Sequence, residues 1–126
     1  MKIIRTLFAL LAFVATASAH ALDVAPYTAA ALTQAQQAGK AYALHFHADW
    51  CPVCRKQSQV IDTLKADPKL NVTVFIVNYD KEKALRKQYG VRTQSTLIAF
   101  RGKTETGRLA GDTDPVVIRD TLESAL

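Results

Sequence analysis

The sequence predicts an α/β domain in which a central mixed sheet of about four strands carries helices on both faces. Two observations lead to this fold class. Strand-like segments alternate with helix-like segments from residue 28 to residue 100, and only the turn 101–103 separates the last two strand segments. Strands joined through helices pair in parallel with right-handed crossovers, whereas a short turn joins antiparallel strands. We therefore expect a parallel pair that is extended by an antiparallel hairpin.

The first half of the chain contains two helices and the strand between them. A run of helix formers lies between Thr28, which suits an N-cap, and Gly39, which suits the C-terminal end. Residues 41–48 form a mostly apolar, alternating run of strand length. Apolar residues then recur at helical spacing over 51–66, until Pro68 stops the pattern. The strand therefore leads almost directly into the second helix.

The second half supplies the remaining strands and helices. Residues 71–79 are β-branched and apolar, as expected of an interior strand buried on both faces. Residues 81–90 read as a short helix that ends at a glycine. Residues 95–100 and 104–111 are predicted to form the hairpin. The segment 114–126 closes the chain as a helix, with an aspartate as N-cap and a proline at its first position.

The N-terminus has the pattern of a secretory signal peptide, which we assign to residues 1–21. Lys2 and Arg5 precede an apolar run over 7–14, and the small-residue segment "ATASAHA" follows. The apolar run is shorter than the ~20 residues that span a bilayer, which makes a retained membrane anchor the weaker alternative. The sequence therefore predicts export, and the bacterial form of the leader predicts the periplasm.

Cleavage after Ala19 or Ala21 fits the small-residue rule, and we take 22–126 as the mature domain. Once Lys2 and Arg5 are removed, 14 of the 16 basic residues remain against 11 acidic ones, and they are scattered along the chain. This small excess of basic over acidic residues argues against a nucleic-acid partner. A domain of this size can bury its hydrophobic core without a structural disulfide, so the two cysteines are free for chemistry. We also expect the protein to be a monomer.

The two cysteines, Cys51 and Cys54, stand at the first turn of the second predicted helix, close enough to form a disulfide. The positive end of the helix dipole favours a thiolate at Cys51, which is therefore the expected attacking sulfur. Cys54, one turn further in, is expected to resolve the mixed disulfide. Pro52 fixes the start of the helix and brings no N–H, while Trp50 offers apolar surface to a substrate.

Three segments resemble the thioredoxin family: "ADWCPVC" after a strand, "YGVRTQSTLIAFRGK", and "LAG" before the last helix. The "F-x-ADWC" pattern is also similar to the C-terminal thioredoxin-like domain of the periplasmic reductase DsbD. The resemblance implies a thioredoxin-like fold and disulfide exchange through Cys51 and Cys54. It further implies that the partners are disulfides or dithiols of exported proteins, with a membrane electron donor and no cofactor, and that the protein acts as a reductant.

Ser95 is the main departure from the family pattern. A cis-proline stands at this position in thioredoxins, and a cis bond before a serine would cost about 2.5 to 4 kcal/mol, so we expect the Gln94–Ser95 bond to be trans. The family loop docks the substrate backbone beside the cysteines. The resemblance therefore assigns substrate binding to five residues: Trp50, Pro52, Gln94, Ser95 and Thr96.

His45 is the second departure, because it occupies the place of a buried aspartate that assists proton transfer in thioredoxins. A histidine can shuttle a proton near neutral pH, so His45 is a candidate catalytic residue that activates Cys54. A hydrogen-bonded core histidine is the alternative. His47, two residues further along the strand, is expected to have a packing role.

Two other functions stay open at this stage. His45 and His47 share a strand face, and with Cys51 and Cys54 they form a possible ligand set for zinc, copper or an iron–sulfur cluster. The other alternative is a binding module that keeps the fold with an inert disulfide. Thiol–disulfide exchange remains the main prediction, since the cysteines lie where a strand meets a helix.

Overall fold

A computed structural model describes residues 21–126, so the predicted signal peptide lies outside the described residues except for Ala21. The elements follow one another as β1 (Asp23–Pro26), α1 (Ala29–Gln37), β2 (Ala41–His47), α2 (Pro52–Leu64), β3 (Thr73–Asn78), α3 (Lys83–Tyr89), β4 (Thr96–Arg101), β5 (Thr104–Ala110) and α4 (Pro115–Glu123). Within this part of the chain, no helix is long and apolar enough to cross a membrane.

The sheet is mixed, and its strand order is β1-β3-β2-β4-β5. β3 pairs in parallel with both β1 and β2, whereas β2–β4 and β4–β5 are antiparallel. The predicted fold class and hairpin are thus confirmed. The sheet has five strands where about four were expected, because the edge strand β1 spans only four residues and ends in a proline, which gives little strand signal.

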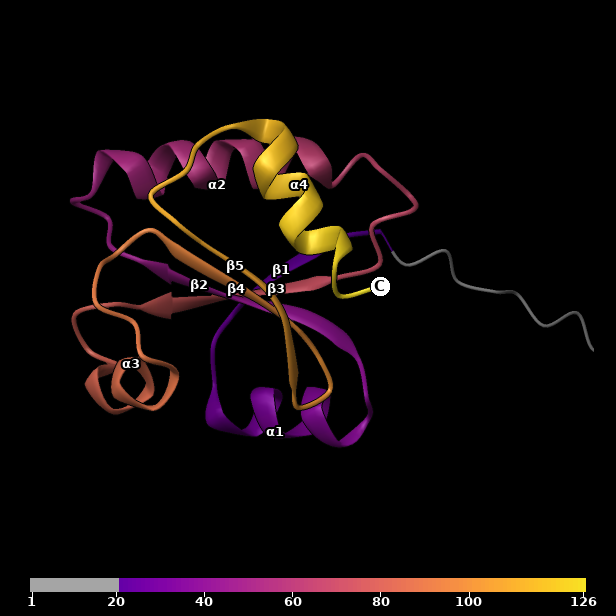
Figure 1. Ribbon diagram of the computed structural model, residues 1–126, viewed down its shortest axis with the longest axis horizontal. Coiled ribbons are helices and arrows are strands. Elements are labelled where there is room, and N and C mark those ends of the chain that lie inside the picture. Colours follow the sequence, from indigo (N-terminus) through magenta and orange to yellow (C-terminus); the bar gives the residue numbers. More distant parts are fainter. Residues whose placement is uncertain (1–20) are drawn as a thin grey trace, which may run out of the picture.

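Helices α2 and α4 cover one face of the sheet, and α1 and α3 lie on the other (Figure 1). β2 is the middle strand, and its residues alternate between the two layers. Ala43 packs with Ile61 of α2 and Leu122 of α4, whereas Leu44 packs with Leu32 of α1. His45 therefore lies on the α2 and α4 face, next to the helix that carries the cysteines.

Local signals in the sequence set the helix ends. The hydroxyl oxygen of Thr28 accepts the Ala31 N–H at 3.0 Å, and a carboxylate oxygen of Asp114 accepts the Val116 N–H at 2.8 Å. Gly90, in the left-handed conformation at φ 63°, ends α3. These predicted helix ends are confirmed, and α2 begins as expected, with Cys51 as N-cap and Pro52 at the first helical position.

Candidate active site

The cysteines lie at the carboxyl end of β2, where the short loop 48–50 turns the chain into α2. Cys51 donates its N–H to the carbonyl oxygen of Ala48 at 3.0 Å, which holds the loop in place. Its sulfur accepts the N–H of Cys54 at 3.1 Å, and no disulfide joins the two residues. The Cys51 Sγ atom therefore caps the helix, at the positive end of its dipole.

The two sulfurs differ in their surroundings. Both cysteines are buried, but Cys51 lies at the N-terminus of α2 and Cys54 lies one turn further into the helix. Burial, followed by the hydrogen bond with Cys51, raises the pKa of Cys54 to about 11. Cys54 is consequently a neutral thiol near pH 7, and Cys51 at the helix terminus is the better placed nucleophile.

We expect iodoacetamide to modify Cys51 at least about tenfold faster than Cys54 at pH ~8, because a thiol with a pKa near 11 is then a thiolate in only about one molecule in a thousand. Peptide mass spectrometry after short exposure of the reduced protein measures both rates. In a Cys51→Ser variant, Cys54 should stay slow, because burial is the main cause of its raised pKa. Equal rates in the unmodified protein would contradict this asymmetry.

Trp50 presents an exposed aromatic surface beside Cys51. Its indole is 59% exposed and donates its Nε1–H to a carboxylate oxygen of Asp80 at 2.8 Å. The ring forms part of the wall of a hollow of about 350 Å³. The hollow is lined by His47, Ala48, Asp49, Trp50, Ile76, Asn78 and Asp80. Asp80 was not found from the sequence, because nothing local links it to a residue thirty positions earlier.

His45 is fully buried on β2 and is hydrogen-bonded to α2. Its Nε2 atom lies 2.8 Å from Oε1 of Gln57, whose amide nitrogen donates to the carbonyl oxygens of Ser95 and Asp112, each at 2.9 Å. Burial is the main reason why the pKa of His45 falls to about 4. His45 is therefore neutral near pH 7, which is the form that can accept a proton.

Ser95 lies in the loop that precedes β4, next to the carboxyl end of β2. Its N–H donates to the carbonyl oxygen of Phe46 at 2.9 Å, and its own carbonyl oxygen accepts the Gly111 N–H at 3.0 Å. Residues 21–126 contain no cis peptide bond, so the Gln94–Ser95 bond is trans, as expected. Thr96 is buried, and its hydroxyl donates to the carbonyl oxygen of Thr93 at 2.8 Å. Gln94, by contrast, is only half-buried.

Ser95 has a φ of 60°, and it is the one non-glycine residue in the described part of the chain with a positive φ. A side chain in this left-handed region is strained by about 1 kcal/mol. We expect Ser95→Gly to raise the free energy of unfolding by up to about 1 kcal/mol in urea titrations. Gln94→Gly, at a neighbour without a positive φ, should lower it instead. A lower free energy of unfolding in Ser95→Gly would show that the Ser95 side chain stabilises the fold by more than its backbone strain destabilises it.

The ligand set that the metal alternative requires does not come together. Among residues 21–126, no group of three or more His, Cys, Asp or Glu side chains is placed to hold a metal ion. The Nε2 atom of His45 faces Gln57, and that of His47 lies 3.0 Å from a carboxylate oxygen of Asp49. The two imidazole rings are tilted against each other, with their centroids 5.4 Å apart.

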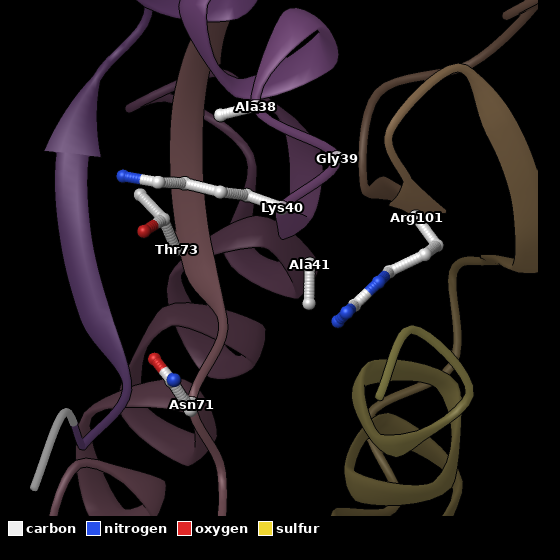
Figure 2. A pocket seen from close by; sticks show the side chains of 7 residues that line it. All are labelled: Ala38, Gly39, Lys40, Ala41, Asn71, Thr73 and Arg101. Atoms are coloured by element: carbon white, nitrogen blue, oxygen red, sulfur yellow. The ribbon is translucent and has the colours of Figure 1, made fainter.

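A second hollow, of about 330 Å³, lies at the opposite end of β2 (Figure 2). Lys40 and Arg101 supply its charged groups, and Asn71 and Thr73 its neutral polar ones. The length of β2 separates this hollow from Cys51, a span of roughly 20 Å. The hollow therefore has no part in the chemistry of the cysteines.

A mixed sheet flanked by helices, with two unlinked cysteines at the N-terminus of one helix, the first capping the helix and the second held as a neutral thiol one turn further in, defines a thiol–disulfide oxidoreductase. Comparison with known proteins then places it more closely. The thioredoxin family model matches residues 23–124, and the chain belongs to the thioredoxin family. It is a thioredoxin-type thiol–disulfide oxidoreductase.

Individual relatives agree with this assignment. Thioredoxin 1 of Nostoc sp. is 31% identical over 81 residues, which is 64% of this chain and 76% of the relative. The crystal structure of Trxlp from Edwardsiella tarda is 41% identical, with a TM-score of 0.74 over 79% of this chain and 98% of that one. A thioredoxin variant from Halobacterium salinarum is 26% identical, with a TM-score of 0.69 over 87% and 95% of the two chains.

Proposed function

We propose that this protein is an exported reductant that delivers two electrons from Cys51 and Cys54 to disulfides of other exported proteins. One observation carries the proposal: the Cys51 sulfur caps α2 while Cys54 is held as a buried neutral thiol one turn below. The first sulfur is thus placed to attack, and the second is kept protonated until it is needed.

The reaction proceeds in two exchanges. The Cys51 thiolate attacks one sulfur of the substrate disulfide, forms a mixed disulfide and releases the other sulfur as a thiolate, which takes a proton from water. Cys54 then gives its proton to His45 and attacks the Cys51 sulfur. The second substrate sulfur leaves as a thiolate and takes a proton from water, while His45 gives up the proton that it received. The substrate is thus released as a dithiol, and the Cys51–Cys54 disulfide that remains carries the two-electron oxidation.

The proposed direction of electron flow is supported by how few groups stabilise the reduced form of the couple. A strongly oxidising couple stabilises its thiolate. Here the Cys54 N–H is the one hydrogen-bond donor to the Cys51 sulfur within the described residues, and Pro52 contributes no N–H. Burial also disfavours a thiolate at Cys54. Both features favour the disulfide over the dithiol, which is the property of a reductant.

The leader pattern at residues 1–21 supports the proposed export, and we propose the periplasm as the location of the protein. Thiols in that compartment are oxidised unless electrons are supplied, so a reductant must restore Cys51 and Cys54, and we propose a membrane electron donor for this step. Expression of the full chain in a bacterium should give a periplasmic protein that begins at His20 or Leu22, and chain 22–126 alone should stay in the cytoplasm. A full chain that remains uncleaved in the cytoplasm would contradict the assignment.

The reduction potential of the Cys51–Cys54 couple tests whether the protein acts as a reductant. Equilibration of the purified protein with defined thiol–disulfide buffers, followed by mass spectrometry of alkylated thiols, should place the couple at about −230 mV or below. A value near −120 mV would mark an oxidant and overturn the reductant role, while leaving disulfide exchange itself intact.

Trp50 should matter for protein substrates more than for small ones, because its exposed indole offers apolar surface next to Cys51. Trp50→Ala is expected to lower kcat/KM for a protein disulfide about tenfold, with a smaller effect on a small aromatic disulfide. Trp50→Phe, which keeps an aromatic surface, should retain most of the activity. Equal losses with both substrates would assign Trp50 to the chemistry at Cys51 and not to docking.

A further inference from the structure

Gln57 is a buried polar residue on the face of α2 that carries Cys54. The two residues are three positions apart, so their side chains leave the helix on the same side. Gln57 is only 1% exposed, and its side chain joins three segments that are distant in sequence. These are His45 on β2, the loop at Ser95 and the loop at Asp112.

The partners of Gln57 fix which way its amide points. The carbonyl oxygens of Ser95 and Asp112 can only accept hydrogen bonds, so the side-chain nitrogen of Gln57 must face them. Its Oε1 atom, which can only accept, is then left facing Nε2 of His45 at 2.8 Å. A neutral histidine in this position must therefore carry its proton on Nε2.

The other ring nitrogen of His45 is left bare. Its Nδ1 atom is buried and has no hydrogen-bond partner among the described residues. With Nε2 protonated, Nδ1 holds the lone pair that can receive a proton. His45 is hydrogen-bonded to Gln57, whose side chain leaves α2 one helical turn after Cys54, so Gln57 links the bare nitrogen to the helix that carries the buried thiol.

We propose that Gln57 is a positioning residue of the redox centre, which locks His45 in the Nε2–H tautomer and so keeps Nδ1 as the basic nitrogen. The consequence for turnover rests on the proposed role of His45 as acceptor of the Cys54 proton. Because the pKa of Cys54 is about 11 and that of His45 about 4, the proton stays on Cys54 at rest and moves only as Cys54 attacks.

The tautomer can be measured directly on the reduced wild-type protein. Long-range ¹H–¹⁵N correlation spectra of the histidine ring at pH ~7 should show His45 with a protonated Nε2 and a bare Nδ1. Gln57→Met matches glutamine in length but removes the strong acceptor, so the Nδ1–H form should appear. A wild-type spectrum with Nδ1 protonated would overturn the proposal even if the variant failed to fold. An unchanged Nε2–H signature in Gln57→Met would also overturn it.

A second readout follows the chemistry with dithiobis-nitrobenzoate. Attack by Cys51 releases the first thionitrobenzoate, and attack by Cys54 on the mixed disulfide releases the second. Gln57→Met should slow the second release at least about threefold and leave the first unchanged. Gln59→Met, the same change at an exposed position of α2, should alter neither phase.

The two readouts separate the positioning role of Gln57 from the proton role of His45. A tautomer that changes in Gln57→Met together with a slower second release supports both. If the tautomer changes as expected while the second release is unaffected in both Gln57→Met and His45→Leu, the positioning by Gln57 stands. The proton role of His45 in the proposed function would then fail.

Discussion

Cys51→Ser should lower the rate of disulfide reduction by at least about a thousandfold, because it removes the sulfur that attacks the substrate. The substitution replaces one small buried atom, so the fold should be retained. The assay is the reduction of a protein disulfide by the reduced enzyme, followed as precipitation of insulin chains with dithiothreitol as electron source. Wild-type protein should accelerate the reaction, and the variant should match the rate of dithiothreitol alone.

Cys54→Ser is the matched control, since it keeps the attacking sulfur and removes the resolving one. Its turnover should also be lost, but it should accumulate a mixed disulfide between Cys51 and the substrate that non-reducing gels and mass spectrometry detect. If Cys51→Ser traps substrate through Cys54 instead, the assignment of the attacking and resolving sulfurs would be reversed.

Acidification from about pH 6.5 to pH 4 should lower the free energy of unfolding by about 3 kcal/mol through His45 alone. The pKa of His45 is about 4 in the folded protein and near 6.5 when unfolded. Between these values the unfolded state binds more protons, so its share grows as the pH falls. The stability that neutral His45 supplies is complete above about pH 6.5. Urea unfolding at several pH values measures the loss.

The double variant His45→Leu with Gln57→Met isolates this contribution, because it replaces both partners of a buried hydrogen bond with apolar side chains of similar size. Near pH 7 it should be less stable than the wild type by about 1 to 3 kcal/mol, because the carbonyl oxygens of Ser95 and Asp112 lose the Gln57 donor. It should lack most of the decline between pH 6.5 and 4, while the effect of Asp67, whose pKa is lowered by the Lys69 N–H and Arg119, remains at lower pH. A decline as steep as in the wild type would remove His45 as the cause.

The helices and the interior strands could be predicted from the sequence because their signals are local. Thr28, Pro115 and Gly90 mark helix ends through hydrogen bonds and backbone angles that involve only a few neighbouring residues. The same is true of Cys51 and Cys54, whose relation to the helix terminus depends on a spacing of three. The edge strand β1 was missed because it exists only through its pairing with β3.

The rest of the site depends on contacts between distant segments. Asp80 holds the indole of Trp50 from a separate loop, and Gln57 bonds to a loop 55 positions further along the chain at Asp112. No short pattern encodes such pairs. The one available signal for Gln57 was its place three residues after Cys54, on the helix face that packs against the sheet. A polar glutamine side chain on an apolar helix face needs hydrogen-bond partners there.

The central claim is that Cys51 and Cys54 are the redox centre of the protein. The most direct test counts the electrons that this pair transfers to a substrate when no other reductant is present. Protein reduced at Cys51 and Cys54, freed of dithiothreitol and mixed anaerobically with excess protein disulfide, should generate two new substrate thiols per molecule. Mass spectrometry should find its own cysteines joined as one intramolecular disulfide. If no substrate thiols form and both cysteines remain reduced, this pair is not the redox centre of the protein.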